Sequence, residues 1–462
     1  MNASPTAAQD LFYEGTRRLA AGELAAAEAA FREALRLDPA LAEASGNLGL
    51  VLDRAGRAAE AEAAYLHALA LAPGQGETCT NLGVLWLEQQ RLDDAEWALQ
   101  RALAIHPESP SAWTHYGVLL ACRHQDEAAE RHHRQALTLS PGYRKARFNL
   151  AYLLLRQGRY EEGWQCFEAR DWYEQLASLL DAPRWQGEPL AGKSILVGIE
   201  AGHGDMIQFC RYARELKARG ARRVSVLCHP ALKRLFRGLA GADDAIAVGD
   251  PAPAGVVWDY WSPPMSFPYF FDTRVDTVPA ELPYLHVEPQ QVADWAQALG
   301  DKGGVLRVGL VWKGNPRFEN DSERSLRSLA ELAPLGDVAG VRFYSLQKGA
   351  GEAEAAASPF PIVDLAPRIA DFSDTAAILA NLDLLISVDT AVAHLAGALG
   401  RPCWLLLPDY KTDWRWLTER TDSPWYPGVM RLFRQGAAGG WTPVVAALRA
   451  ALMAHPGRKP PG

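Results

Sequence analysis

The chain has 462 residues, of which 48% are hydrophobic and 22% are charged, and it carries a formal net charge of −8. This length predicts roughly two to four domains, and the composition excludes a largely disordered chain. The negative charge excludes a broad affinity for nucleic acids or anionic membranes, although it leaves room for a local basic pocket.

The start of the chain and its cysteines predict a protein that stays in the cytoplasm. The segment "MNASPTAAQDLF" has neither the basic nor the apolar region of a signal peptide. No stretch approaches the roughly 18 apolar residues that cross a bilayer. The six cysteines lie far apart and form no CxxC pair, so they indicate neither a zinc site nor a disulfide framework.

Residues 1–170 repeat with a period of 34, which Pro39, Pro73, Pro107 and Pro141 mark. Other residues recur in phase: Gly15, Gly49, Gly83 and Gly117, then Ala27, Ala61, Ala95 and Ala129, and the larger Phe31, Tyr65 and Leu99. This period predicts stacked helical hairpins whose helices approach closely at the small residues. The pattern resembles the tetratricopeptide repeat, which implies an all-α superhelix that binds an extended polypeptide and performs no chemistry.

One position of the repeat carries a candidate set of acceptor-binding residues. Asn47, Asn81 and Asn149 share this position, and His115 replaces asparagine in the fourth repeat. Because an amide both donates and accepts hydrogen bonds, a row of them can hold a peptide backbone. The row resembles the asparagine-lined groove of the nucleocytoplasmic O-linked N-acetylglucosamine transferase. The alternative is that "NLG" is simply common repeat sequence.

A different architecture follows a Pro-, Trp- and Gly-containing linker at 171–192. Strands are expected at 194–202, 222–230, 305–316, 341–349, 383–389 and 402–408. Helices are expected between them at 206–220, 372–382 and 390–400. Alternating strands and helices predict two Rossmann-like lobes with parallel sheets, an N-terminal lobe at 193–302 and a C-terminal lobe at 303–455. A flexible tail is expected at 456–462.

The stretch "SVDTAVAHLAGALGRP" places polar residues where a strand gives way to a helix. Free N–H groups and a partial positive charge make the start of this helix, near Asp389 and Thr390, a seat for phosphate. Ala391 leaves room for a ligand, and His394 lies one turn after Thr390 on the same face. The alternative is that Asp389 only caps the helix and His394 belongs to the core.

This stretch resembles the donor-binding segment of heptosyltransferase-like GT-B glycosyltransferases, S-x-D-T/S-x-x-x-H. The resemblance implies that Ser387, Asp389, Thr390, Ala391 and His394 hold the nucleotide diphosphate of a sugar donor.

Three further segments resemble parts of the same family. "GHGDMIQF" resembles the G-x-G-D segment, which makes Asp205 the candidate general base, although Asp205 and Gln208 could instead form a helix cap. "LVWKGNP" implies a phosphate contact from Lys313, with Asn315 in the turn after it, and the alternative is a surface lysine. Arg324 in "NDSERSL" is a candidate phosphate or acceptor contact, or else a solvated arginine.

A tryptophan-rich segment near the C-terminal end has two interpretations. Trp414, Arg415 and Trp416 either wall the cleft or seal the edge of the lobe. The segment also resembles bacterial proteins that join tetratricopeptide repeats to such a glycosyltransferase domain, and these include proteins that modify flagellin.

The resemblances imply an inverting, metal-independent glycosyltransferase. It would transfer a sugar to Ser or Thr of a protein held by the repeats, with the nucleotide sugar as co-substrate and no other cofactor. Flagellin is the first acceptor to test. The alternatives are a lipid-linked saccharide acceptor and a non-catalytic adaptor.

Overall fold

The computed structural model describes residues 5–251, 253, 255–437 and 439–457. The chain divides between Leu153 and Leu154 into two compact units, each of which is described by itself. From residue 458 onward, the tail predicted at 456–462 lies outside the described residues. Among the helices so described, none is both long enough and apolar enough to cross a membrane.

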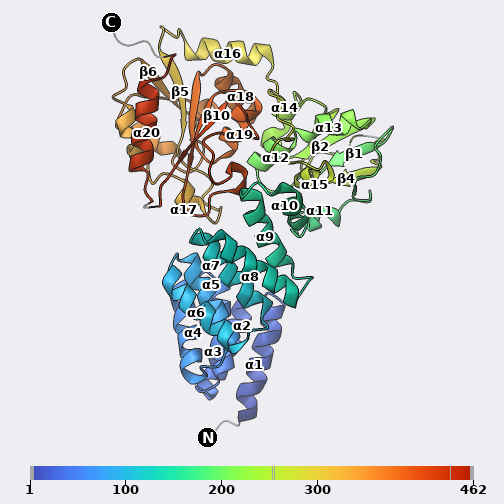
Figure 1. Cartoon of the computed structure of the whole chain (residues 1–462), viewed down its shortest axis with the longest axis vertical. Coiled ribbons are helices and arrows are strands. Elements are labelled where there is room, and N and C mark those ends of the chain that lie inside the picture. The colour runs from blue at the N-terminus through green and yellow to red at the C-terminus, as the bar shows by residue number, and fades with distance from the viewer. Residues whose placement is uncertain (1–4, 252, 254, 438, 458–462) are drawn as a thin grey trace. The chain divides into compact units, whose positions relative to one another are not determined.

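The first unit consists of antiparallel helical hairpins (Figure 1). Its helices are α1 (Pro5–Ala20), α2 (Leu24–Leu37), α3 (Ala42–Arg54), α4 (Ala58–Leu71), α5 (Gly76–Glu88), α6 (Leu92–Ile105), α7 (Pro110–Cys122), α8 (Asp126–Leu139) and most of α9 (Arg144–Arg156). The all-α repeat region expected from the 34-residue period is confirmed.

The in-phase glycines explain how each hairpin closes. A Cβ atom at Gly49 of α3 would lie 2.6 Å from the ring of Tyr65 in α4, and one at Gly83 would lie 2.7 Å from Leu99. No real Cβ atom tolerates such a distance, so a larger residue would force the paired helices apart. Small residues in one helix therefore receive large residues from the other, as the period predicts.

The second unit is built on two open, wholly parallel sheets (Figure 1). Its strands are β1 (Ser194–Val197), β2 (Arg223–Cys228), β3 (Asp244–Ala247), β4 (Tyr260–Ser262), β5 (Leu306–Val311), β6 (Val341–Ser345), β7 (Ile362–Asp364), β8 (Leu384–Val388), β9 (Cys403–Leu407) and β10 (Met430–Arg434). The strand order is β3-β2-β1-β4 in one sheet and β10-β9-β8-β5-β6-β7 in the other. The parallel α/β architecture is thus confirmed.

The helices of the second unit precede, connect and follow these strands. They are α10 (Tyr160–Phe167), α11 (Glu174–Ala177), α12 (His203–Phe209), α13 (Tyr212–Ala218), α14 (Lys233–Phe236), α15 (Phe267–Phe270), α16 (Pro289–Leu299), α17 (Asp321–Arg324), α18 (Phe372–Ala380), α19 (Ala391–Ala398) and α20 (Thr442–Met453). Short 3-10 helices are η1 (Pro230–Leu232), η2 (Pro264–Ser266), η3 (Leu329–Leu335), η4 (Glu352–Ala357), η5 (Ala366–Arg368) and η6 (Trp414–Trp416).

Helix α10, which the sequence places in the repeat array, belongs to the second compact unit. Its aromatic side chains account for this grouping. The Tyr160 hydroxyl accepts a hydrogen bond from Trp425 Nε1 at 3.1 Å, and Trp164 Nε1 donates to the Thr273 carbonyl at 2.9 Å. Trp164 also packs edge-on against Trp414, with ring centroids 5.2 Å apart. Buried aromatic pairs of this kind are strongly stabilising.

The segment around Asp205 differs in detail from the sequence prediction. The strand expected at 194–202 ends at Val197, and the helix begins at His203 instead of Met206. Gly202 is the residue before the helix, so Asp205 lies in its first turn. The expected single helix is also interrupted, because α12 ends at Phe209 and α13 starts at Tyr212.

Candidate functional site

The candidate donor residues follow two neighbouring strands of the larger sheet. Strands β5 and β8 pair in parallel, with Val311 opposite Ser387, so both strands end at the same edge. The chain leaving β5 carries Lys313, and the chain leaving β8 carries Asp389. All residues of both strands are buried, which is typical of parallel strands covered on both faces. Ligands bind at this edge of open α/β sheets.

Thr390 and Ala391 form the start of α19, and Ser387 lies near the end of β8. The Ser387 hydroxyl lies 3.0 Å from the Thr390 hydroxyl, which belongs to the residue preceding the helix. The Thr390 side chain makes no capping hydrogen bond, and α19 begins at Ala391. The first N–H groups of a helix have no partner within the helix, so this turn is suited to an anion.

Asp389 does not cap α19. Its Oδ2 accepts a hydrogen bond from Trp416 Nε1 at 2.8 Å, and its Oδ1 lies 3.9 Å from His394 Nε2. Burial and the nearby Asp413 carboxylate raise the pKa of Asp389 to about 6. Asp389 therefore gains a proton more readily than an exposed aspartate does.

His394 is buried and held on two sides. Its Nδ1 lies 2.8 Å from the Tyr426 hydroxyl, and its ring stacks on Trp416 with centroids 5.3 Å apart. Burial, followed by the Arg415 charge, holds the pKa of His394 well below its usual range. The imidazole is therefore neutral at physiological pH.

Asp205 has a defined partner for each carboxylate oxygen. Its Oδ2 accepts the Gly202 N–H at 2.9 Å, and its Oδ1 accepts a hydrogen bond from the Arg415 guanidinium. Through the Gly202 contact Asp205 makes a capping interaction at the start of α12, as the cap alternative expected, but Gln208 takes no part in it, because its Oε1 accepts from Arg415 Nε at 2.5 Å. The Asp205 side chain is 25% exposed, which leaves it reachable by a substrate hydroxyl.

Gly204 brings the Asp205 segment and the donor segment together. A Cβ atom at Gly204 would lie 3.0 Å from His394 Cδ2 and 3.4 Å from Ala391 Cα. The first turns of α12 and α19 therefore lie directly against each other, and only a glycine permits this separation without a shift. Asp205 and the Asp389–His394 group thus lie on neighbouring segments.

Lys313 forms an ion pair with a carboxylate of η4. Its Nζ donates to Glu354 Oε1 at 2.5 Å, and its backbone N–H donates to Gln347 Oε1 at 3.0 Å. Burial opposes ionisation of Glu354, but hydrogen bonds from Lys313, the Leu329 backbone and Trp312 lower its pKa overall. The lysine predicted to contact phosphate is paired with this carboxylate in the structure.

Asn315 lies in the segment after β5, and Arg324 is the last residue of α17. Arg324 Nε donates to Asp321 Oδ1 at 3.0 Å, and its guanidinium lies 4.3 Å from the centre of the Phe318 ring. Its charge also acts to lower the pKa of Asp389. Asn315 is exposed, and its side chain accepts the Arg317 N–H at 3.1 Å.

The four candidate acceptor residues lie on successive odd-numbered helices of the first unit. Asn47, Asn81 and Asn149 are half-buried on α3, α5 and α9. His115 on α7 is buried, and its Nε2 lies 3.3 Å from Lys145 Nζ. Burial, helped by the Lys145 charge, lowers the pKa of His115 to about 3, so this residue is a neutral member of the row.

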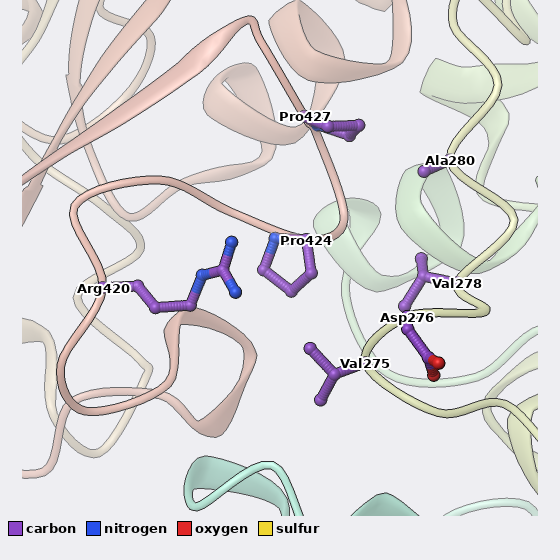
Figure 2. Close-up of a pocket in the computed structure, with 7 residues that line it drawn as sticks. All are labelled: Val275, Asp276, Val278, Ala280, Arg420, Pro424 and Pro427. Atoms are coloured by element: carbon purple, nitrogen blue, oxygen red, sulfur yellow. The ribbon is translucent and has the colours of Figure 1, made fainter.

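A surface hollow of about 450 Å³ lies apart from these residues. Figure 2 shows it between the loop that carries Val275 and Val278 and the loop that carries Arg420 and Pro424. Arg211 joins the two loops by donating to the carbonyls of Pro279 and Trp425, at 3.2 and 2.7 Å. The hollow contains none of the predicted site residues.

Sequence reasoning missed several parts of the site. Glu354 and Gln347 carry no local signal, because their importance depends on segments distant in the sequence, and Gly204 belongs to the G-x-G-D segment but was not singled out. Arg415 and Trp416 stood out only as part of a tryptophan-rich segment. Within the part of the chain that the structure describes, no three His, Cys, Asp or Glu side chains group as a metal site.

Comparison with known proteins agrees with this architecture. The family "Glycosyltransferase family 9 (heptosyltransferase)" matches residues 331–406, which include β8 and α19. Tetratricopeptide repeat families match residues 14–76, 123–179 and 54–115. The matched glycosyltransferase segment therefore contains Asp389 and His394, but not Lys313 or Asp205.

Among curated proteins, the chain is 31% identical over 337 residues to Protein FlbA of Caulobacter vibrioides. The alignment covers 66% of this chain and 54% of FlbA, so the chain spans about half the length of that relative.

Solved structures give weaker likenesses. PilF of Pseudomonas aeruginosa is 23% identical with a TM-score of 0.33, covering 36% of this chain and 75% of its own. TTC0263, a tetratricopeptide protein of Thermus thermophilus, is 24% identical with a TM-score of 0.33, covering 37% and 92%. Likenesses this weak carry no argument about the chain. On the family matches and its two kinds of unit, the chain combines tetratricopeptide repeats with a glycosyltransferase family 9 domain.

Proposed function

We propose that the chain is a protein O-glycosyltransferase that moves a sugar from a nucleotide sugar to Ser or Thr of a polypeptide held by the repeats. The observation that carries this proposal is the approach of α12 and α19 at Gly204, which unites a carboxylate and an anion-binding helix start. The two parallel sheets of the second unit are consistent with a GT-B arrangement.

The donor half of the proposed reaction uses the edge of the larger sheet. The start of α19 at Thr390 and Ala391 would hold the diphosphate, and Lys313 would exchange Glu354 for phosphate. Arg324 adds positive charge nearby. Preorganised donors and cations of this kind stabilise the charge that develops on a leaving phosphate, the task that a metal ion performs in other enzymes.

The acceptor half uses Asp205. Its carboxylate would take the proton of the acceptor hydroxyl while the hydroxyl oxygen bonds to the anomeric carbon. The bond from that carbon to the leaving phosphate oxygen breaks in the same step, and its electron pair leaves with the nucleoside diphosphate. Attack from the face opposite the leaving group inverts the anomeric configuration.

The repeats would select the acceptor. Their match to tetratricopeptide families supports a polypeptide partner, and the amides of Asn47, Asn81 and Asn149 suit a peptide backbone. The resemblance to bacterial proteins that modify flagellin makes flagellin the first acceptor to test. A lipid-linked saccharide is the competing acceptor, and a non-catalytic adaptor is the competing function.

The test is a transfer assay with the full-length chain. Purified flagellin and a panel of ADP-, UDP-, GDP- and CDP-linked sugars are incubated with the wild type or with Asp205→Asn, and acceptor mass is followed. We expect a mass increase on Ser or Thr with the wild type only, while both proteins bind the nucleoside diphosphate. Transfer to a lipid-linked saccharide but to no protein would support the competing acceptor. Nucleotide binding without any transfer would support the adaptor.

A further inference from the structure

The turn formed by Asp413 and η6 contacts both sides of the candidate site. We propose that Arg415 in this turn is a positioning residue that fixes the Asp205 carboxylate for proton transfer. This inference rests on the proposed function of Asp205 as the general base. It gives a role to the tryptophan-rich segment, which the sequence alone predicted either to wall the cleft or to seal the edge of the lobe.

The guanidinium of Arg415 is held from two directions before it reaches Asp205. Its Nη1 donates to both carboxylate oxygens of Asp413, at 3.0 and 2.9 Å, and its Nε donates to Gln208. The guanidinium also lies 4.5 Å from the centre of the Trp414 ring. Because the group is planar and its side chain is 6% exposed, these contacts leave little freedom to rotate. Its remaining nitrogen, Nη2, is thus presented to Asp205 in one direction.

These contacts fix the Asp205 carboxylate but leave part of its hydrogen-bond acceptor capacity unused. An ionised carboxylate accepts about four hydrogen bonds, and the Gly202 N–H and Arg415 account for two at Asp205. Each oxygen therefore retains acceptor capacity for a substrate hydroxyl. Because both oxygens are held, the carboxylate plane has a fixed orientation.

The neighbouring Trp416 connects the same turn to the donor side. Its Nε1 donates to Asp389, and its ring stacks on His394. Arg434 anchors the end of the turn by donating to the carbonyls of Trp416 and Leu417, at 2.6 and 2.8 Å. A displacement of this turn would therefore disturb the base and the donor-side residues together.

A positioning role differs measurably from a merely structural one. If Arg415 acts through Asp205, its loss should lower kcat but leave donor affinity and acceptor KM unchanged, and it should cost nothing further once Asp205 has been replaced. A residue that only supports the fold would lower stability and affect donor affinity as well.

The experiment compares Arg415→Met, Arg415→Lys, Asp205→Asn and the double variant Asp205→Asn/Arg415→Met with the full-length wild type. Transfer to flagellin, calorimetric affinity for the nucleoside diphosphate of the active donor, and melting temperature are measured. Arg420→Met is the matched control, because Arg420 pairs with the exposed Asp422 in the next loop at 2.7 Å.

We expect Arg415→Met to lower kcat by about 100-fold, the order of loss that a small misplacement of a reacting group causes. Arg415→Lys should recover part of this loss, because lysine keeps the charge without the fork. The double variant should be no slower than Asp205→Asn, and Arg420→Met should match the wild type.

The two hypotheses can fail separately. Wild-type transfer by Asp205→Asn would overturn the proposed base itself. If Asp205→Asn is inactive but Arg415→Met keeps wild-type kcat, or if the double variant multiplies the two losses, the positioning role is overturned. If Arg415→Met does not fold, Asp413→Asn serves instead, because it weakens only the Asp413 contact that holds the Arg415 guanidinium. An unchanged kcat in that variant would overturn the inference.

Discussion

Replacing Gly204 with alanine tests the close approach on which the site depends. The added Cβ would lie 3.0 Å from His394 Cδ2 and 3.4 Å from Ala391 Cα, so one of these groups must give way by a few tenths of an ångström. His394 has little room to move, because the Tyr426 hydroxyl holds one edge and Trp416 covers a face. The strain should therefore fall on the start of α19.

Two effects of opposite sign determine how much Gly204→Ala changes the free energy of unfolding. Alanine favours a helix over glycine by about 0.5–1 kcal/mol, while overpacking typically costs about 1–3 kcal/mol. We expect a net loss of about 1 kcal/mol in the free energy of unfolding. If a similar free energy is lost from the anion-binding turn, affinity for a nucleoside diphosphate should fall by about 5-fold. Gly204→Val should lower both quantities further.

Calorimetric titration with ADP, UDP, GDP and CDP, together with urea unfolding, measures both effects. Gly436→Ala is the matched control, because a Cβ at Gly436 would meet no atom within 4 Å. Wild-type nucleotide affinity in Gly204→Val would show that the donor does not bind where α12 meets α19, and the proposed site would then be rejected.

Three further predictions concern the donor and acceptor groups. Because the folded-state pKa of Asp389 is raised to about 6, its ionisation destabilises the fold as pH rises through that value. Asp389→Asn should therefore raise the free energy of unfolding at pH 8 by up to about 3 kcal/mol, with no gain at pH 4 in urea titrations. Lys313→Ala should lower nucleoside diphosphate affinity about 10-fold by calorimetry, whereas Lys348→Ala, which removes an exposed partner of Glu352, should not. Combined Asn47→Ala, Asn81→Ala and Asn149→Ala should weaken flagellin binding in pull-down assays by about 0.5–1.5 kcal/mol per lost hydrogen bond, with donor affinity unchanged.

Much of the fold follows from local sequence patterns. The 34-residue period predicts the hairpins because each glycine faces a large side chain one helix away, as Gly49 and Tyr65 do. Strands β5 and β8 are mostly apolar and buried throughout, so they are also visible in the sequence. The three-residue strands β4 and β7 are not, because so few residues establish no periodicity.

The candidate site is less predictable than the fold. Asp389, Thr390 and His394 are adjacent in sequence, and a single strand-to-helix transition brings them together. Arg415 meets Asp205 across 210 positions of sequence, and the pairing of Lys313 with Glu354 spans 41. Such contacts depend on how strands are ordered within a sheet and on how the two sheets are placed, which local propensity does not encode.

The end of the repeat array shows how side-chain size decides where a helix packs. The repeat pattern continues through α10, yet Tyr160, Trp164 and Phe167 place large rings on this short helix. These rings bury themselves against Trp414 and Trp425, next to the turn that carries Arg415. A truncated protein that starts at the linker, residue 171, lacks α10. Because α10 belongs to the second compact unit, its removal would expose the aromatic surface of that unit. The smallest fragment able to retain the candidate site therefore includes α10, and the repeat pattern extends beyond the boundary at which the compact units divide.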